Sequence, residues 1–225
     1  MRILNLLLVI LVALSLISCG IPVDNLISPI TRIIKSPQGN GYESYSSVRW
    51  SENSLPVRIV APSSKKELIE PSLRSVCEKW NRAAGRDVIV YSFEEYESNN
   101  TSMTAIEDGK NRLYFSDSWS NLGQSDDSLA VTYYSYYGGV MVMKEGDIVF
   151  NVGNQIFYTD FSESKMFTNI SQYDFESMLL HEVGHFMGLD HSSDADSVML
   201  PSISNNALSR DLSLEDIREI FEKYN

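Results

Sequence analysis

The sequence predicts an α+β domain, because strand patterns and helix patterns follow one another in separate runs along the chain. Residues 55–62 alternate and are rich in β-branched side chains, as strands are. Residues 64–84 carry apolar side chains at helical spacing and stop before Gly85, a typical helix end. Further strand patterns cover residues 87–93 and 112–117. Segregated runs of this kind are typical of an α+β architecture.

The stretch 129–152, LAVTYYSYYGGVMVMKEGDIVFNV, predicts further strands separated by two turns. The turns are expected at Gly138-Gly139 and at Glu145-Gly146-Asp147, because glycine and acidic residues favour turns. The tyrosines of this stretch are interpreted as sheet packing rather than a binding platform; they are Tyr133, Tyr134, Tyr136 and Tyr137. Residues 97–110 are expected to form a loop.

Local signals place the helix boundaries. Pro71 is expected in a first turn or at a break of the helix over 64–84, because proline cannot donate an amide hydrogen bond. Asp174 is an N-cap candidate for a helix that runs into the histidines. A last helix over 213–224 begins with Ser213 followed three residues later by Asp216, a pattern similar to a capping box.

Length and charge limit the function. The chain has 225 residues, of which 43% are hydrophobic, so a packed core is expected. It has 18 basic and 30 acidic residues, a net charge of −12. This balance argues against nucleic acid as a partner, because phosphate binding needs clustered Lys and Arg. The acidity is interpreted as a solubility feature, and a monomer is expected.

The N-terminus predicts an exported lipoprotein. Arg2 precedes an apolar run over 3–17, which is shorter than the roughly 20 residues of a membrane span and is typical of a secretory signal. Leu16-Ile17-Ser18-Cys19 resembles the lipobox of bacterial lipoproteins. The resemblance implies a signal peptide over 1–18 and a lipid-anchored Cys19, with Gly20 favouring an outer membrane or cell surface. A plain secretory signal and an uncleaved anchor are the alternatives.

Residues 19–54 are predicted to form a tether, because they are rich in Ser, Pro, Gly and Asn, although their apolar residues allow part of the segment to pack. The compact domain is expected over 55–225. If Cys19 carries lipid, Cys77 has no intrachain disulfide partner. Cys77 falls on the apolar side of the helix over 64–84 and is interpreted as a buried thiol rather than a nucleophile.

All three histidines of the chain lie in HEVGHFMGLDH, residues 181–191. His181 and His185 are four residues apart and share one face of a helix, so both can bind one metal. Gly188 permits the chain to turn and bring His191 to the same metal as a third ligand. Three imidazoles with a fourth position open are typical of catalytic Zn²⁺. The alternative is a buried helix whose histidines only make hydrogen bonds.

Glu182, beside the first ligand, is the candidate general base. Its carboxylate can reach a water on the metal without being a ligand, accept the proton and return it to the leaving amine. The motif from His181 to His191 resembles the long zinc motif of the metzincin endopeptidases. Met199, followed by Pro201, stands where that family has its methionine turn, and Ser192 after the third histidine is similar to the matrixin branch.

The resemblance implies a zincin-like α+β fold. Its expected parts are a twisted, mixed five-stranded sheet, a long helix, the zinc-site helix, the Met-turn and a C-terminal helix. It also implies that Leu200 to Ser204 form a wall of the specificity pocket, with Ile203 at a position where matrixins tend to have an aromatic residue. Peptide substrate would bind as an extended strand at the sheet edge, for which GGVMVM (138–143) is a candidate; an interior strand is the alternative.

The sequence also departs from the matrixin pattern. No histidine remains for the second, structural zinc of many matrixins, so that site is expected to be absent. Calcium binding is a further possibility at Asp126-Asp127 or at 145–147, although solvated loop charges are the favoured interpretation of these residues. The segment Cys19 to Asp24 resembles the matrixin cysteine switch with one extra residue, but an acylated Cys19 would have no thiol to offer.

The sequence therefore predicts a lipid-anchored zinc endopeptidase. Glu182 acts as general base, three histidines bind the metal, and Met199 supports the site. Two alternatives remain. One is a membrane-anchored, zinc-binding surface lipoprotein without peptidase activity, against which the retained Glu182 argues. The other is a zinc hydrolase that acts on a non-peptide amide.

Overall fold

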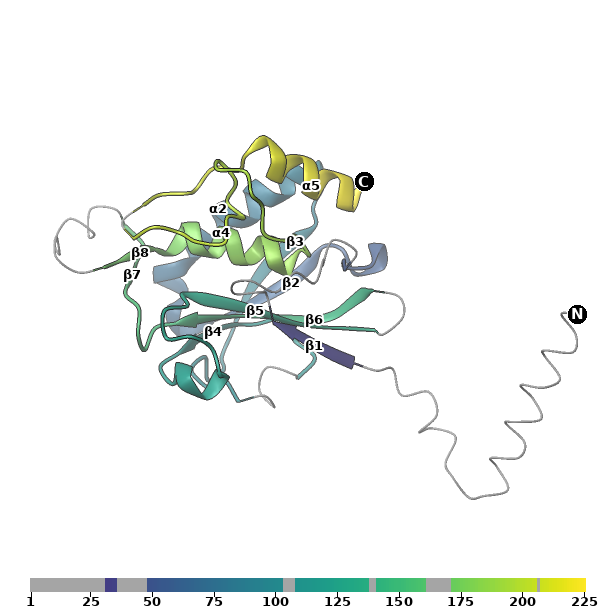
Figure 1. Ribbon diagram of the computed structural model, residues 1–225. Coiled ribbons are helices and arrows are strands. Elements are labelled where there is room, and N and C mark those ends of the chain that lie inside the picture. The colour runs from purple at the N-terminus through teal and green to yellow at the C-terminus, as the bar shows by residue number, and fades with distance from the viewer. Residues whose placement is uncertain (1–30, 36–47, 103–107, 138–140, 161–170, 206) are drawn as a thin grey trace, which may run out of the picture. The chain divides into compact units, whose positions relative to one another are not determined.

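The computed structural model describes residues 31–35, 48–102, 108–137, 141–160, 171–205 and 207–225 (Figure 1). Residues Arg32–Asn225 form one compact unit. The fold is a mixed sheet with its long helices on one side, as Figure 1 shows, which confirms the predicted α+β class. Among the described residues no helix is both long enough and apolar enough to span a bilayer.

The larger sheet has four strands in the order β1-β5-β6-β4. They are β1 (Thr31–Lys35), β4 (Leu113–Ser116), β5 (Ala130–Tyr137) and β6 (Val142–Asn151). β5 and β6 are antiparallel, whereas β4 and β6 are parallel, so the sheet is mixed as predicted. β1 belongs to the segment predicted as a tether, and it takes the outer position beside β5.

A parallel pair of strands extends this sheet. β2 (Val57–Pro62) pairs with β3 (Ile89–Glu94). A bridge between Val60 and Arg112 places β2 next to the start of β4, which gives the order β3-β2-β4-β6-β5 with β1 at the far edge. Buried β-branched and aromatic residues explain why these segments become strands, since such side chains pack well on a pleated surface.

Among the described residues, two helices, α2 (Lys66–Ala84) and α4 (Phe175–Phe186), pack against the sheet, and α5 (Leu214–Tyr224) packs on α2. The helix α2 also packs against α4. Gly85 ends α2 at φ 70°, in the left-handed region that glycine adopts without strain. The capping box at Ser213 and Asp216 is present, as predicted. Pro71, however, lies inside α2, which continues through it, so the prediction of a first turn or a break there was wrong.

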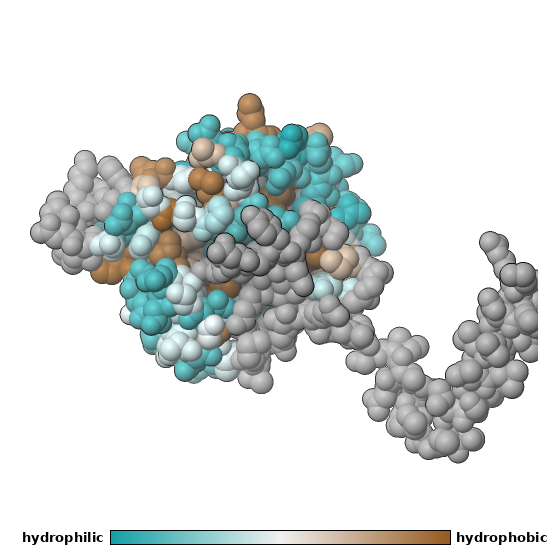
Figure 2. Space-filling model, viewed as in Figure 1, coloured by the Kyte–Doolittle hydropathy of each residue, from teal (hydrophilic) through white to brown (hydrophobic). Residues whose placement is uncertain are grey.

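The smaller elements are short. They are the 3₁₀ turns η2 (Glu52–Ser54), η3 (Ser63–Lys65) and η4 (Trp119–Leu122), and the parallel pair of β7 (Phe157–Tyr158) with β8 (Tyr173–Asp174). The part of the predicted loop 97–110 that the structure describes contains no helix or strand. The visible face is largely hydrophilic, with apolar residues among the polar ones, in keeping with the net charge of −12 (Figure 2).

The predicted turn at 145–147 is not present, because these residues lie within β6. Two of them are acidic, yet backbone donors accommodate both side chains: Glu145 accepts from the amide of Gly109 (2.8 Å) and Asp147 from the amide of Arg112 (2.8 Å). Gly146 leaves room for an aromatic ring, since a Cβ there would lie 2.8 Å from the Phe186 side chain. The predicted turn at Gly138-Gly139 lies outside the described residues.

Buried donors hold the C-terminal end of α4 in place. The indole of Trp50 donates to the carbonyl of Phe186 (2.8 Å), and the Tyr224 hydroxyl donates to the carbonyl of Met187 (2.8 Å). Trp80 on α2 donates to the carbonyl of Leu180 (3.1 Å). Carbonyls at a helix end have no partner within the helix, so the bonds to Phe186 and Met187 satisfy two of them and fix the direction in which the chain leaves α4. The bond to Leu180 ties the middle of α4 to α2.

Candidate metal centre

The helix that carries the first two histidines begins at a strong cap. The Asp174 carboxylate accepts from the amide of Ser177 (2.8 Å), as the N-cap prediction requires, and from Nε of Arg210 (2.8 Å). Every residue of α4 is buried. A helix buried on all sides has a fixed position, so the side chains that it presents to the site are fixed as well.

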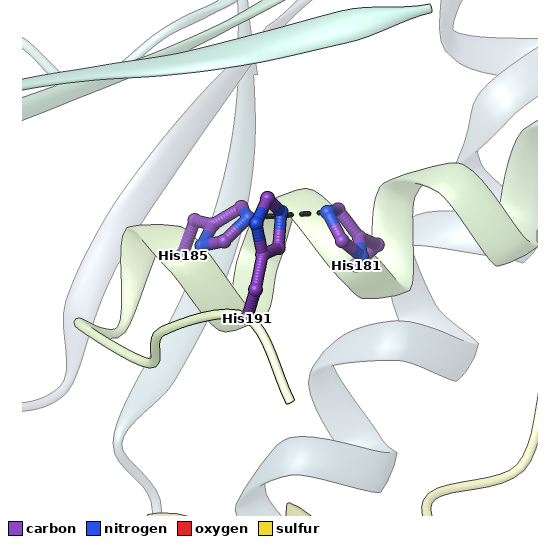
Figure 3. Close-up of side chains that lie close together, drawn as sticks. All are labelled: His181, His185 and His191. Atoms are coloured by element: carbon purple, nitrogen blue, oxygen red, sulfur yellow. Dashed lines mark hydrogen bonds between the residues drawn. The ribbon is translucent and has the colours of Figure 1, made fainter. Parts of the chain in front are cut away.

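The three histidines converge as the sequence predicts. His181 and His185 point from successive turns of α4, and His191 reaches the same point from the following loop (Figure 3). One nitrogen of each imidazole lies within 4.8 Å of the other two. The Nε2 atoms of His181 and His185 are 3.1 Å apart. The turn between them and His191 depends on Gly188, whose φ is 83° and where a Cβ would collide with the Val48 carbonyl.

The remaining ring nitrogens set the tautomers of the two helical histidines. Nδ1 of His181 lies 2.8 Å from the carbonyl of Val198, and Nδ1 of His185 lies 2.8 Å from the carbonyl of Leu189. A carbonyl can only accept, so each Nδ1 carries the hydrogen and each Nε2 keeps a lone pair that faces the cluster. Such carbonyl contacts are the usual outer support of metal-binding histidines.

Burial keeps the imidazoles neutral. It lowers the pKa of His181 to about 4 and the pKa of His185 well below its usual value, and it also lowers the pKa of His191. Metal binding requires deprotonated nitrogen, so a divalent cation at this point competes with few protons at neutral pH. Three converging neutral imidazoles therefore fit a borderline-soft cation such as Zn²⁺.

The structure gives no support to the suggested calcium sites. Among the described residues, the histidine cluster is the one group of three or more potential ligands close enough to share an ion. Glu145 and Asp147 are buried in β6 rather than on a loop, with exposed fractions of 4% and 1%. Asp126 and Asp127 are exposed, and an Oδ1 of Asp126 accepts from Asn154 (3.3 Å).

Glu182 lies beside the cluster but is not part of it. Its Oε2 accepts from the hydroxyl of Thr132 (2.6 Å), and it lines a cleft of about 160 Å³ together with the three histidines. Burial raises the pKa of Glu182 to about 7, and the Thr132 hydrogen bond opposes this rise. A carboxyl group that titrates near neutral pH can both take up and release a proton, as a general base must.

Met199 packs against α4 at Gly184. It is fully buried, and a Cβ on Gly184 would overlap its sulfur. The turn that carries it is held at two points: the amide of Ser192 donates to the Met199 carbonyl (2.9 Å), and the amide of Val198 donates to Asp216 (3.0 Å). Met199 is therefore where the Met-turn prediction placed it, directly against the metal-site helix.

Two stretches of chain form the walls of the cleft. One is formed by residues 127–130, which lead into β5, and the other by residues 200–203 after the Met-turn, so most of the predicted wall from Leu200 to Ser204 is in place. Tyr173 and Met178 also line the cleft. The candidate substrate edge at 138–143 is not a free edge in its described part. Met141 and Met143 share backbone hydrogen bonds with Arg49, and Val142 and Met143 pair with β5.

Cys77 is buried in the core, as predicted, and burial raises the pKa of its thiol to about 12, which makes it a poor nucleophile. Of the tyrosines in β5, only Tyr137 is exposed, and Tyr133, Tyr134 and Tyr136 pack as predicted. Cys19 and the suggested cysteine switch lie outside the described residues.

Sequence reasoning did not find two residues of the site. Thr132 is 50 positions before Glu182, and a strand pattern does not show which hydroxyl faces the helix. Asp216 was identified as a capping residue, but its contacts to Ser197 and Val198 on the Met-turn were not predicted. Both depend on tertiary packing, which local spacing does not encode.

The fold and the site together define a zincin-type metalloprotein, in which a buried helix and the loop after it present three imidazoles with a glutamate at their side. The matrixin family model matches residues 49–225, so the chain belongs to the matrixin family.

Several metalloendoproteinases are similar to this chain over a short stretch. Metalloendoproteinase 1 of Glycine max is 43% identical over 54 residues, 24% of this chain and 18% of the relative. Metalloendoproteinase 5-MMP of Arabidopsis thaliana is 43% identical over 51 residues, 23% and 14% of the two chains. Matrilysin of Felis catus is 48% identical over 52 residues, 23% and 20% of the two chains. The matches therefore span a fifth or less of each relative's length.

Proposed function

We propose that the protein is a zinc-dependent endopeptidase that cleaves peptide bonds of proteins. The observation that carries this proposal is the arrangement of three neutral imidazoles around one point with Glu182 beside them in a cleft. Membership of the matrixin family and the names of the similar metalloendoproteinases support it.

His181, His185 and His191 would hold the metal. Bound zinc would supply a Lewis acid that polarises the scissile carbonyl and increases the acidity of a bound water. Glu182 takes the proton from the attacking water and returns it to the leaving amine, for which its raised pKa of about 7 is suited. Its burial excludes bulk water from the base, so the proton stays available for the leaving group.

The substrate is a peptide held in an extended form between the two walls of the cleft. An extended chain exposes backbone donors and acceptors on both sides, and strand-like pairing is a common way to bind one without regard to sequence. The apolar side chains that line the cleft favour an apolar substrate side chain next to the scissile bond; they include Leu129, Met178, Leu200 and Ile203.

A Glu182→Gln variant tests this function. We expect it to bind zinc like the wild type, because Glu182 is not a ligand, and to lose at least about 100-fold in peptide cleavage, in line with the loss of a general base. Glu222→Gln, at an exposed position of α5, is the matched control and should cleave normally. Undiminished cleavage by Glu182→Gln would refute the assignment. Zinc content without any hydrolysis by the wild type would favour the zinc-binding lipoprotein, and cleavage of non-peptide amides alone would favour the zinc hydrolase that acts on a non-peptide amide.

The protein is exported and anchored to a bacterial cell envelope through lipid on Cys19, after removal of residues 1–18. The lipobox resemblance of Leu16 to Cys19 supports this part of the proposal. Several acyl chains together hold a domain stably at a bilayer, at about 0.8 kcal/mol per buried CH₂. A Cys19→Ser variant should no longer incorporate a labelled fatty acid and should leave the membrane fraction. Unchanged labelling of that variant would exclude Cys19 as the lipidated residue.

A further inference from the structure

Thr132 in the middle of β5 makes the shortest contact to the proposed base. Its hydroxyl lies 2.6 Å from Oε2 of Glu182 and 3.1 Å from the main-chain carbonyl of the same residue. Thr132 is fully buried and Glu182 is 1% exposed, so no bulk solvent competes for this bond. The contact joins the sheet directly to the metal-site helix.

The single hydroxyl hydrogen points to the carboxylate, which is both the nearer and the more basic of the two acceptors. A bond from a neutral donor to a buried carboxylate is stronger than a bond between neutral groups, because the charge reinforces it. The bond from Thr132 occupies only Oε2 of Glu182. Among the described residues, Oε1 has no hydrogen-bond partner, and Glu182 lines the cleft.

We propose that Thr132 is a positioning residue, which anchors Oε2 of Glu182 so that Oε1 faces the reacting water and the leaving amine. The inference rests on the proposed peptidase function. A glutamate side chain has three rotatable bonds, and a base is effective only when its oxygen stays within hydrogen-bond reach of the proton that it takes. The hydroxyl restricts this freedom from the opposite side of the base, without contact to substrate or metal.

A purely structural role would require only the volume of Thr132 between β5 and α4. Valine has nearly the same shape but no hydroxyl, and serine has the hydroxyl without the methyl group. Comparing Thr132→Val with Thr132→Ser therefore separates volume from hydrogen bonding. Ser135→Ala is the matched control, since Ser135 is also buried on β5 and its hydroxyl has no partner among the described residues.

The experiment measures kcat, KM and zinc content of the full chain with a peptide substrate. We expect Thr132→Val to lower kcat about tenfold to 100-fold, the range for losing a hydrogen bond to a charged group, with KM and zinc content close to the wild type. Thr132→Ser should recover most of kcat, and Ser135→Ala should leave it unchanged. A wild-type kcat in Thr132→Val, or a Thr132→Ser variant as impaired as Thr132→Val, would overturn the proposal.

A second measurement does not depend on activity. In the metal-free protein, the denaturation midpoint is compared for the wild type, Thr132→Val, Glu182→Ala and the double variant. If the bond exists, Thr132→Val shifts the midpoint less in the Glu182→Ala background than in the wild type, because neighbouring sites are not additive. Additive shifts would overturn the proposal. A wild type that cleaves no peptide would refute the peptidase function alone, and this cycle would still decide whether Thr132 holds Glu182.

Discussion

Gly184 on α4 lies so close to Met199 on the turn beneath it that any side chain at position 184 would overlap the methionine sulfur. Trp80 on α2 also borders position 184: a Cβ added to Gly184 would lie 3.1 Å from the Trp80 ring. The glycine is at one of the two variable positions of the zinc motif between Glu182 and His185. Its small size allows the metal-site helix to rest directly on the Met-turn.

The first prediction follows from this contact. Gly184→Ala should destabilise the protein by about 1–3 kcal/mol, the usual cost of overpacking a dense core, although alanine favours helix more than glycine does. The strain should also weaken zinc binding, because Val198, which positions His181, is next to Met199. Chemical denaturation and zinc titration measure the two effects.

The Met199→Ala background is the control for that prediction. By itself it should cost roughly 2–5 kcal/mol, because it leaves a cavity under α4. In that background the added methyl group of Gly184→Ala enters the vacated space, so its penalty should shrink or change sign. An equal penalty in both backgrounds would show that the sulfur is not what excludes a side chain from position 184.

The histidine cluster could be predicted from the sequence because its geometry is local. Helix periodicity fixes the relation of His181 to His185, and a glycine turn brings His191 back within six residues. The N-cap at Asp174 and the capping box at Ser213 are equally local and were predicted correctly. Such features depend on contacts only a few residues apart, which spacing along the chain describes well.

The features that were missed depend on distant contacts. Glu145 and Asp147 were predicted to lie in a turn. Nothing in the local sequence shows that the amides of Gly109 and Arg112 donate hydrogen bonds to these side chains, which allows both to be buried in a strand. Thr132 gave no signal for the same reason. The strand β1 lies in the segment predicted as a tether, whose apolar residues were expected to allow packing, but its partner β5 follows almost 100 positions later and was not predicted.

A second prediction concerns His191, the one metal-ligand candidate that is only half-buried and lies outside the helix. His191→Ala should abolish tight zinc binding and cleavage while changing the stability of the metal-free protein by less than about 0.5 kcal/mol, as at other partly exposed sites. In wild type, saturating zinc should add stability, about 2.7 kcal/mol at a free concentration 100 times the dissociation constant. Calorimetry with and without a chelator measures both; a thermal midpoint of His191→Ala that still rises with zinc would contradict the assignment.

The third prediction concerns Asp216, which joins α5 to the Met-turn. Its carboxylate accepts from the hydroxyl of Ser197, from the amide of Val198 and from the amide of Ser213. Asp216→Ala leaves three buried or half-buried donors without an acceptor, so it should cost about 2–4 kcal/mol. Urea denaturation gives the value, and Glu222→Ala, at an exposed position of the same helix, should stay within about 0.5 kcal/mol of wild type. A small cost for Asp216→Ala would show that other groups satisfy these donors.

The fourth prediction concerns Asp147, a carboxyl group buried in the sheet far from any expected function. Burial, together with the nearby Glu145 and Asp108, raises its pKa from 3.8 to about 9, and the amide and guanidinium of Arg112 oppose this rise. The folded state therefore binds a proton that the unfolded state releases above about pH 4. Stability must then fall as pH rises through this window, and the full cost is reached only above about pH 9.

Asp147→Asn removes this titration but keeps an oxygen that can accept from the amide of Arg112. Relative to wild type, the variant should therefore gain roughly 2–4 kcal/mol between pH 5 and pH 8, at 1.36 kcal/mol per unit of pKa difference. Denaturation in matched buffers across that range, with metal-free protein so that the histidine cluster does not bind zinc, measures the difference. Asp126→Asn, on the exposed loop before β5, is the control and should leave the pH profile unchanged. Parallel profiles for Asp147→Asn and wild type would mean that Asp147 stays ionised in the folded protein, with its charge met by Arg112.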